Sequence, residues 1–233
     1  MNCELPASFT VLTRAFIYYK SNVIMIKPIT IVLASQSENR KQLLSSLGVS
    51  FIVAPSRINE ENVHAKTPEK LAQAIARAKA QAVASRMHGI IIAADSFLMH
   101  AGLQYQKPKT LDEAKAMLRQ FSGKTSHILT GVHIINTYEQ REVSNVNKLS
   151  VQCIELSEER IAEYVATRPV MEWAGAHNPL DPVSASIFLP IGKMKYKREY
   201  YGIGIETVAE ELRRVGVPFD ISTALASLDK TER

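Results

Sequence analysis

The stretch Leu33-Ala34-Ser35-Gln36-Ser37-Glu38-Asn39-Arg40 joins a predicted strand to a predicted helix. Before it, residues 29–34 form an apolar run bounded by Pro28 and by serines, which is typical of a buried strand. After it, apolar residues recur at helical spacing over residues 39–47, and Gly48 supplies a stop signal. Because the N–H groups and dipole at a helix N-terminus favour anions, this turn predicts a phosphate-binding site.

A second junction carries complementary chemistry. The predicted strand over residues 90–94 runs into Asp95-Ser96, and Gln106-Lys107-Pro108 follows. A carboxylate, hydroxyls, an arginine and a lysine are the groups needed to hold a phosphate chain and a metal ion. Open α/β sheets bind their ligands at the carboxyl ends of strands, where both junctions are expected. The two junctions together predict a nucleotide-cleaving enzyme.

The order of the remaining elements predicts the fold class. Strands and helices alternate in the first half of the chain, whereas strands 126–137 and 143–155 are expected to pair locally across a polar turn. We therefore expect an α/β fold with a mixed twisted sheet flanked by helices. The other predicted elements are a strand over residues 50–54 and helices over residues 67–86, 110–119, 157–167 and 206–215.

Composition narrows the function classes. At 233 residues and 46% hydrophobic content, the chain can bury a full core, as one large domain or as two lobes around a cleft. Its formal charge of +5 comes from 28 basic and 23 acidic residues spread along the chain, so no nucleic-acid partner is predicted. Cys3 and Cys153 lie far apart without metal-ligand spacing, which disfavours a disulfide framework and indicates a reducing, cytoplasmic location.

The N-terminal segment needs its own interpretation. Residues 11–25 are fairly apolar, but Arg14 and Lys20 interrupt them and they fall short of the ~20 residues that a membrane span requires. They also lack the order of a secretory signal, so no membrane partner is predicted, although a transit peptide stays open. We favour Met25 as an alternative start. The expected organisation is a poorly ordered extension, one α/β domain and a tail, with boundaries at residues 1–28, 29–220 and 221–233.

Three ordered motifs lie along this domain. The first is residues 33–44, close to the pattern Leu-Ala-Ser-x-Ser-Pro-Arg-Arg-x-x-Leu-Leu. The second is Ala94-Asp95-Ser96 followed by Gln106-Lys107-Pro108, close to Ala-Asp-Thr and Gly-Lys-Pro. The third, over residues 114–131, contains Phe-Ser-Gly, a histidine and Thr-Gly. Together they resemble the Maf family of nucleotide pyrophosphatases, which shares an architecture with the inosine triphosphate pyrophosphatases, over residues 29–217.

The resemblance implies an activity and a set of site residues. The activity is hydrolysis of a nucleoside triphosphate between its α- and β-phosphates, in a house-cleaning role, with a divalent Mg²⁺ or Mn²⁺ ion, by a two-lobed homodimer with a central cleft. By position, Asp95 matches the catalytic carboxylate, and Lys79 and Lys107 match catalytic phosphate cations. Glu60 matches a metal ligand that acts with Asp95. The residues matched to substrate binding are Ser35, Ser37, Asn39, Arg40, Ser96 and Leu180.

The chain also departs from the family pattern. Asn39 stands at the first arginine and Glu38 at the proline, so one positive charge is lost and one negative charge gained beside the phosphate turn. This change should weaken the contact between the turn and a phosphate group, or move that contact to another residue. Ser96 replaces a threonine and preserves its hydroxyl.

Specificity is left open by a further departure. Leu180 stands where many relatives have a Gln or Glu that helps to choose the base, so that contact is missing unless Asn178 or Asp181 replaces it. The family includes enzymes for dTTP, UTP and modified pyrimidine triphosphates and enzymes for 7-methyl-GTP, and both remain possible. Trp173 is either a stacking surface for a methylated purine or part of the core.

Each site residue has a structural alternative. Ser37 and Asn39 could serve only as helix caps, and Asp95 only as a turn residue at a strand end. Arg40 and Lys79 could be solvated helix cations, whereas His127 is interpreted as structural. At the level of the whole chain, the alternative function is a nucleotide-binding or regulatory Maf-like protein with little catalysis. A Rossmann-type dinucleotide enzyme is disfavoured because no Gly-x-Gly-x-x-Gly follows the first strand.

Overall fold

The computed structural model describes residues 29–179, 181–192, 202–203, 205–214 and 217. The predicted extension 1–28 and tail 221–233 lie outside the described residues, so the predicted domain boundaries stay predictions. In the part of the chain that is described, no helix combines the length and the hydropathy that crossing a membrane would require.

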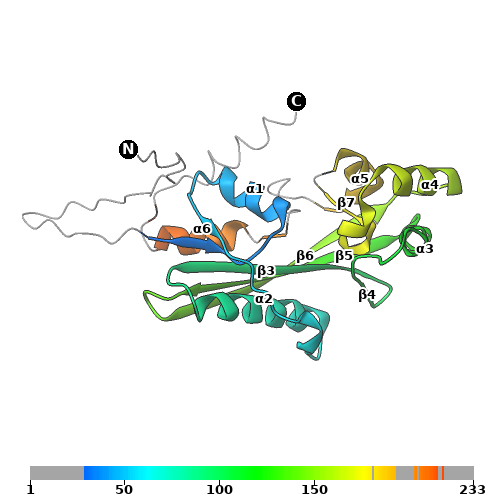
Figure 1. Ribbon diagram of the computed structural model, residues 1–233. Helices are drawn as coiled ribbons and strands as arrows, with labels where there is room; N and C mark the ends of the chain where they lie inside the picture. The colour runs from blue at the N-terminus through cyan, green and yellow to red at the C-terminus, as the bar shows by residue number, and fades with distance from the viewer. Residues whose placement is uncertain (1–28, 180, 193–201, 204, 215–216, 218–233) are drawn as a thin grey trace, which may run out of the picture.

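A seven-stranded mixed sheet forms the centre of the molecule (Figure 1), which confirms the predicted fold class. Its strand order is β2-β1-β3-β5-β6-β7, and β4 pairs with β3. β1 is parallel to β2 and β3, and all other pairs are antiparallel. The strands are β1 (Ile31–Leu33), β2 (Ile52–Val53), β3 (Ile90–His100), β4 (Leu103–Tyr105), β5 (Thr125–Asn136), β6 (Arg141–Cys153) and β7 (Phe188–Pro190).

Helices cover both faces of this sheet. Helix α2 (Pro68–Ala84) packs on one face, where its Ala80 and Val83 join Val32 and Ile91 in one apolar cluster. The larger core lies on the other face, under two groups of helices at opposite ends of the molecule (Figure 1). One group is α1 (Glu38–Ser46) and α6 (Ile205–Arg214), and the other is α3 (Leu111–Phe121), α4 (Glu158–Thr167) and α5 (Pro182–Ile187).

Side-chain caps start three of the helices at the predicted places. The hydroxyl of Thr67 accepts a hydrogen bond from the N–H of Lys70, and Pro68 occupies the first turn of α2. Thr110 and Ser157 accept equivalent bonds at the starts of α3 and α4. Each cap satisfies an N–H group that has no partner within its helix, so the capping signals located these helices correctly.

The predicted end of the third strand is wrong. β3 continues through Asp95 and Ser96 to His100, because its second half pairs with β5 as far as Met99 and His127 and also pairs with β4. Asp95 therefore lies within a strand and not at a strand-to-turn junction. Small and polar residues at this point change the side-chain chemistry of the strand without ending its backbone ladder.

Several short elements were not predicted, among them β4, β7, α5 and a 3₁₀ turn η1 (Glu60–Asn62). α5 had a readable signal, since Asp181 caps the Ser184 N–H and Pro182 occupies the first helical turn. The other three depend on long-range pairing or on a single turn, which leave little periodicity in a sequence.

One glycine allows the sheet and α2 to approach closely. Gly131 in β5 pairs with Asp95 in β3, and a Cβ at this position would lie 2.2 Å from the carbonyl oxygen of Ala72 in α2. No side chain fits in that space. Gly131 therefore sets the distance at which α2 presents Lys79 to the strand that carries Asp95.

Candidate active site

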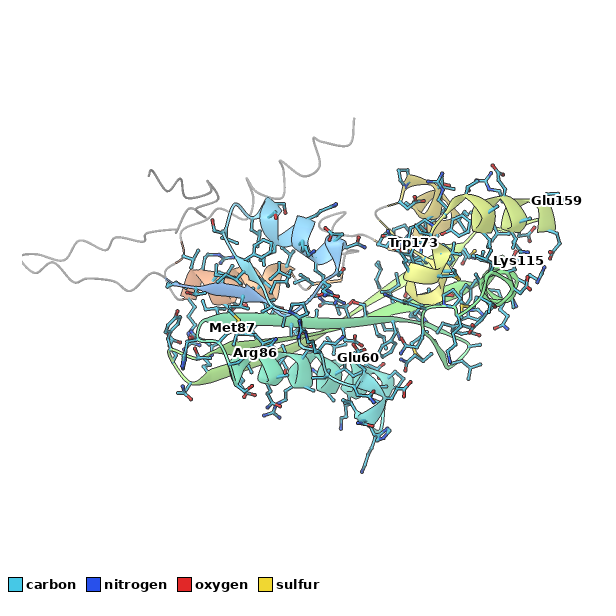
Figure 2. The ribbon with its side chains drawn as sticks, viewed as in Figure 1. Glu60, Arg86, Met87, Lys115, Glu159 and Trp173 are labelled. Carbon is cyan, nitrogen blue, oxygen red and sulfur yellow. The ribbon has the colours of Figure 1, made fainter. Side chains whose placement is uncertain are left out.

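Lys79 lies between two carboxylates from different elements. Its Nζ is 2.7 Å from Asp95 Oδ1 on β3 and 2.7 Å from Glu60 Oε1 on η1. The lysine and the aspartate are 9% and 8% exposed, so the interpretation of Lys79 as a solvated helix cation is wrong. Figure 2 shows Glu60 beside α2, which carries Lys79. Three charges from α2, β3 and η1 thus meet at one point, one of them positive and two negative.

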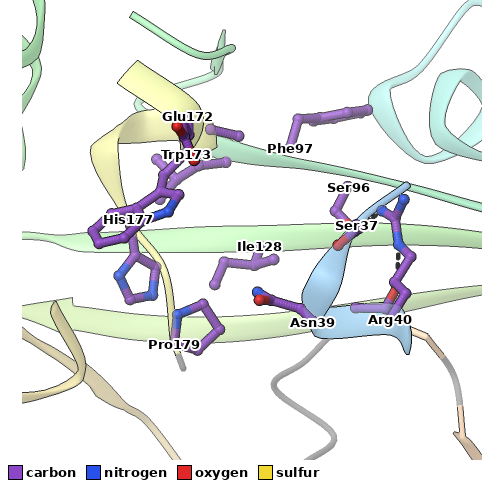
Figure 3. A pocket seen from close by; sticks show the side chains of 13 residues that line it. Ser37, Asn39, Arg40, Ser96, Phe97, Ile128, Glu172, Trp173, His177 and Pro179 are labelled. Atoms are coloured by element: carbon purple, nitrogen blue, oxygen red, sulfur yellow. Dashed lines mark hydrogen bonds between the residues drawn. The ribbon is translucent and has the colours of Figure 1, made fainter. Parts of the chain in front are cut away.

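Arg40 connects the two sequence junctions. Its Nη1 donates to Ser35 Oγ at 3.2 Å. Its Nη2 donates to Ser96 Oγ at 3.0 Å, and Figure 3 shows these two side chains together. Burial lowers the pKa of the Arg40 guanidinium, whereas the nearby carboxylates of Asp95 and Glu60 act to raise it. An arginine pKa begins so high that the group stays cationic at neutral pH. A fixed cation therefore stands beside the buried ion pair.

Hydroxyls and a glycine complete the surroundings of Arg40. Ser96 Oγ lies 3.0 Å from Thr130 Oγ1 in β5, so the serine is held by two partners. Gly202, at φ +75°, approaches so closely that a Cβ would be 2.9 Å from Ser96 Oγ, and its carbonyl oxygen accepts from Arg40 Nε at 3.4 Å. These contacts hold the guanidinium in place.

Helix capping, the structural alternative for Ser37 and Asn39, is not what the first turn of α1 shows. Ser37 occupies the N-cap position but its side chain makes no capping hydrogen bond. Asn39 Nδ2 instead donates to Asn178 Oδ1 at 2.9 Å, across the gap between the two groups of helices. Glu38 forms a 2.6 Å ion pair with Lys41, so the carboxylate that the sequence adds here has its own counter-charge. The predicted electrostatic cost of Glu38 is therefore reduced.

A cavity of about 1030 Å³ brings these groups together. It lies between the lobe that carries α1 and the turn that carries Trp173, which gives the fold its central cleft. Nine of the ten residues singled out in the sequence line it, and the tenth, Leu180, lies outside the described residues. The nine are Ser35, Ser37, Asn39, Arg40, Glu60, Lys79, Asp95, Ser96 and Lys107.

Several lining residues were missed by the sequence reasoning. Arg57 lines the large cavity with its backbone in the left-handed region at φ 56°, which is uncommon for a residue other than glycine. Its place after β2, beside the turn after β1, could have indicated it. Glu172 was missed as well. It lines this cavity from a 3₁₀ turn η2 (Val170–Glu172), next to Trp173.

The residues fit a divalent cation held jointly with a ligand. Among the described residues, no three His, Cys, Asp or Glu side chains are grouped so that they could hold a metal ion by themselves. Glu60 and Asp95 nevertheless bring carboxylate oxygens to one point. Mg²⁺ is commonly bound by one or two carboxylates together with waters and substrate phosphates, so this donor set suits it.

His127 and His177 are engaged in hydrogen bonds outside this cluster. His127 Nδ1 is 3.0 Å from Ser150 Oγ on the adjacent strand β6, in agreement with its structural interpretation. His177 is buried, with Nδ1 2.7 Å from Ser184 Oγ, and desolvation lowers its pKa to about 3. It is therefore neutral at physiological pH.

Fold and site together define an α/β protein whose cleft gathers cations, hydroxyls and two carboxylates. A family model described as "Maf-like protein" matches residues 30–213, and the chain belongs to the Maf family. It is 35% identical over 190 residues to a dTTP/UTP pyrophosphatase of Geobacillus sp. (strain WCH70), covering 80% of this chain and 98% of the relative.

Two further comparisons extend this result. The chain is 37% identical over 153 residues to a nucleoside triphosphate pyrophosphatase of Synechococcus sp. (strain JA-2-3B'a(2-13)), covering 65% of this chain and 77% of the relative. A HAM1 protein structure from Coxiella burnetii aligns at 17% identity with a TM-score of 0.43, covering 80% of this chain and 99% of the other. That structural likeness is too distant to support an inference about this chain.

Proposed function

We propose that this protein hydrolyses nucleoside triphosphates to the monophosphate and pyrophosphate. The observation that carries the proposal is Lys79, held 2.7 Å from both Asp95 and Glu60 in the wall of the large cavity. The relatives named as dTTP/UTP and nucleoside triphosphate pyrophosphatases support it as well.

We assign to Asp95 the role of activating the attacking water. One of its oxygens is engaged by Lys79, and the carboxylate can orient a water molecule and take its proton. The water oxygen forms a bond to the α-phosphorus while the bond from that phosphorus to the α,β-bridging oxygen breaks. The bridging oxygen leaves with the electron pair as part of pyrophosphate.

The cations around the cavity would hold the phosphates. Arg40 is fixed by Ser35 and Ser96, so it requires little rearrangement when a phosphate binds. Lys107 and Arg57 are exposed in the cavity wall and can follow the ligand. Arg57 supplies a positive charge to a cleft in which Asn39 has replaced an arginine of the family pattern.

A divalent ion is part of the proposal. Glu60 and Asp95 would hold it together with phosphate oxygens, and it would supply charge neutralisation on the triphosphate when bound. Magnesium or manganese is the predicted ion. The predicted homodimer and the predicted cytoplasmic location also stay predictions.

The test is release of pyrophosphate from a panel of standard and modified triphosphates with Mg²⁺ or Mn²⁺. The wild type should turn over at least one of them, and Asp95→Asn should lower kcat by about 100-fold or more while the fold persists by circular dichroism. Asp112→Asn is the matched control, since its carboxylate is 93% exposed on α3.

Unchanged turnover in Asp95→Asn would refute the assignment of Asp95. Triphosphate binding by calorimetry without turnover across the panel would instead favour the alternative function, a nucleotide-binding regulatory protein. The ion pair of Glu38 with Lys41 argues against that alternative, because the added negative charge is offset locally.

A further inference from the structure

A second, smaller cavity adjoins the one that holds the charged groups. Its volume is about 160 Å³, and Arg40, Ser96 and Trp173 line both cavities. A triphosphate whose phosphates contact Arg40 in the larger cavity therefore has its nucleoside end within reach of the smaller one. The inference below rests on the proposed function and concerns what this smaller cavity binds.

The smaller cavity has a mixed lining, in which apolar side chains and an indole lie beside polar groups that include Asn39 and Glu172. Leu98, Ile128 and Pro179 line it together with Trp173. Of its polar groups, Arg40 is engaged with Ser35, Ser96 and the Gly202 carbonyl. Figure 3 shows Trp173 and Asn39 on opposite sides of this cavity with Ile128 between them. This arrangement suits a flat ring whose face lies against the indole and whose polar edge meets the polar side of the cavity.

Trp173 is anchored but not enclosed. Part of its side chain packs against the large core, and the rest lines both cavities. Its neighbours are fixed as well, because Gly175 N–H donates to the Gln106 carbonyl oxygen at 3.0 Å and a Cβ on Gly175 would touch Leu98 at 3.0 Å. A rigid indole that faces a cavity loses little entropy when it binds an aromatic ligand.

We propose that Trp173 is the platform on which the nucleobase of the substrate stacks, and that stacking, not readout of the base edge, provides most of the base affinity. Stacking on an aromatic side chain tolerates different bases, because every base has a π-face. The enzyme consequently accepts both pyrimidine and purine triphosphates with similar affinity. Trp173 thus acts beside the phosphate cluster, without contact to the reacting bond.

Trp173 is the only tryptophan of the chain, so its fluorescence reports this contact directly. The probes are the α,β-methylene analogues of UTP and GTP, which cannot be cleaved at the proposed bond, and tripolyphosphate, which has no base. Calorimetry measures binding in parallel. Both nucleotide analogues should change the Trp173 emission at saturation, whereas bound tripolyphosphate should leave it nearly unchanged.

Variants separate stacking from general packing. Trp173→Leu should weaken both nucleotide analogues by about 10- to 100-fold and leave tripolyphosphate binding unchanged, whereas Trp173→Phe should stay within about threefold of the wild type. Tyr138→Leu is the control, because Tyr138 is an exposed aromatic residue that lines neither cavity. The Kd values of the two analogues for the wild type should differ by less than about tenfold.

The outcomes distinguish this inference from the proposed function. Nucleotide binding that leaves the Trp173 emission unchanged overturns the role of Trp173 alone. An unchanged affinity of folded Trp173→Leu does the same, and so does a difference of more than about tenfold between the two analogues. If neither analogue nor tripolyphosphate binds, both the stacking role and the pyrophosphatase proposal fail. The emission measurement uses the wild type, so it tests the contact between Trp173 and the nucleobase even if Trp173→Leu does not fold.

Discussion

At the residue scale, Lys79 is the side chain on which both the stability and the chemistry of the cleft depend. It is the cation that lies between Asp95 and Glu60. Lys79→Met should remove about 3 kcal/mol from the free energy of unfolding, because the buried Asp95 loses the cation that contacts it directly. It should also lower pyrophosphate release by about 100-fold.

Urea denaturation and the pyrophosphate assay measure these two effects. Lys115→Met is the control, since Lys115 pairs at 3.4 Å with the 93% exposed Asp112 and should cost less than about 1 kcal/mol. Equal stability of Lys79→Met and wild type would contradict the interpretation of Lys79 as a buried, paired charge.

His177 predicts a pH dependence of stability. Its folded-state pKa is lowered to about 3, below the unfolded value of 6.5, so the unfolded state binds more protons between these two values. The neutral buried ring stabilises the fold fully above pH 6.5, and this contribution is lost as the pH falls toward 3. The limiting slope for one such group is about 1.4 kcal/mol per pH unit.

The measurement is the free energy of unfolding from pH 7 to pH 4 for the wild type and for His177→Gln. Carboxylates add their own pH dependence, so the difference between the two proteins isolates the histidine. A shallower acid slope in His177→Gln is expected, and parallel curves would contradict a neutral, desolvated His177.

At the element scale, the close approach of α2 to the sheet decides where the site forms. In Gly131→Ala, the new Cβ would lie 2.2 Å from the Ala72 carbonyl oxygen, so α2 must move. We expect a loss of about 3 kcal/mol in stability together with lower activity, because the same helix carries Lys79.

Gly102→Ala provides the comparison for this prediction. Nothing lies within 4 Å of a Cβ at Gly102, and only its φ of +80° makes the change unfavourable, by about 1 kcal/mol. Denaturation curves and turnover rates of both variants should therefore separate crowding from backbone strain. A smaller loss for Gly131→Ala than for Gly102→Ala would be inconsistent with a tight contact between α2 and β5.

The elements that were predicted correctly are those with local signals. Thr67, Thr110 and Ser157 cap their helices as their positions indicated, and the apolar run before Ser35 forms β1. β3 was predicted to end at Ala94, because Asp95-Ser96 looks like a turn in isolation. Pairing with β5 keeps the strand extended, and the partners of Asp95 and Ser96 in that pairing, Gly131 and Thr130, are more than 30 positions away.

At the scale of the whole molecule, the cleft depends on contacts that no local pattern contains. The motifs indicated which residues would gather, but not that Lys79 would join Glu60 to Asp95 or that Asn39 would meet Asn178, 139 positions away. Arg57 was missed for the same reason, since a single arginine after a strand of two residues has no periodic context. Tertiary packing supplied these parts of the site.

The central claim is that water attacks the α-phosphorus of a triphosphate held in this cleft. Turnover of one active triphosphate in ¹⁸O-labelled water, with the products analysed by ³¹P NMR, tests it most directly. We predict one ¹⁸O atom in the nucleoside monophosphate and none in the pyrophosphate. Label in pyrophosphate or in orthophosphate would contradict attack at the α-phosphorus and with it the proposed function of the site.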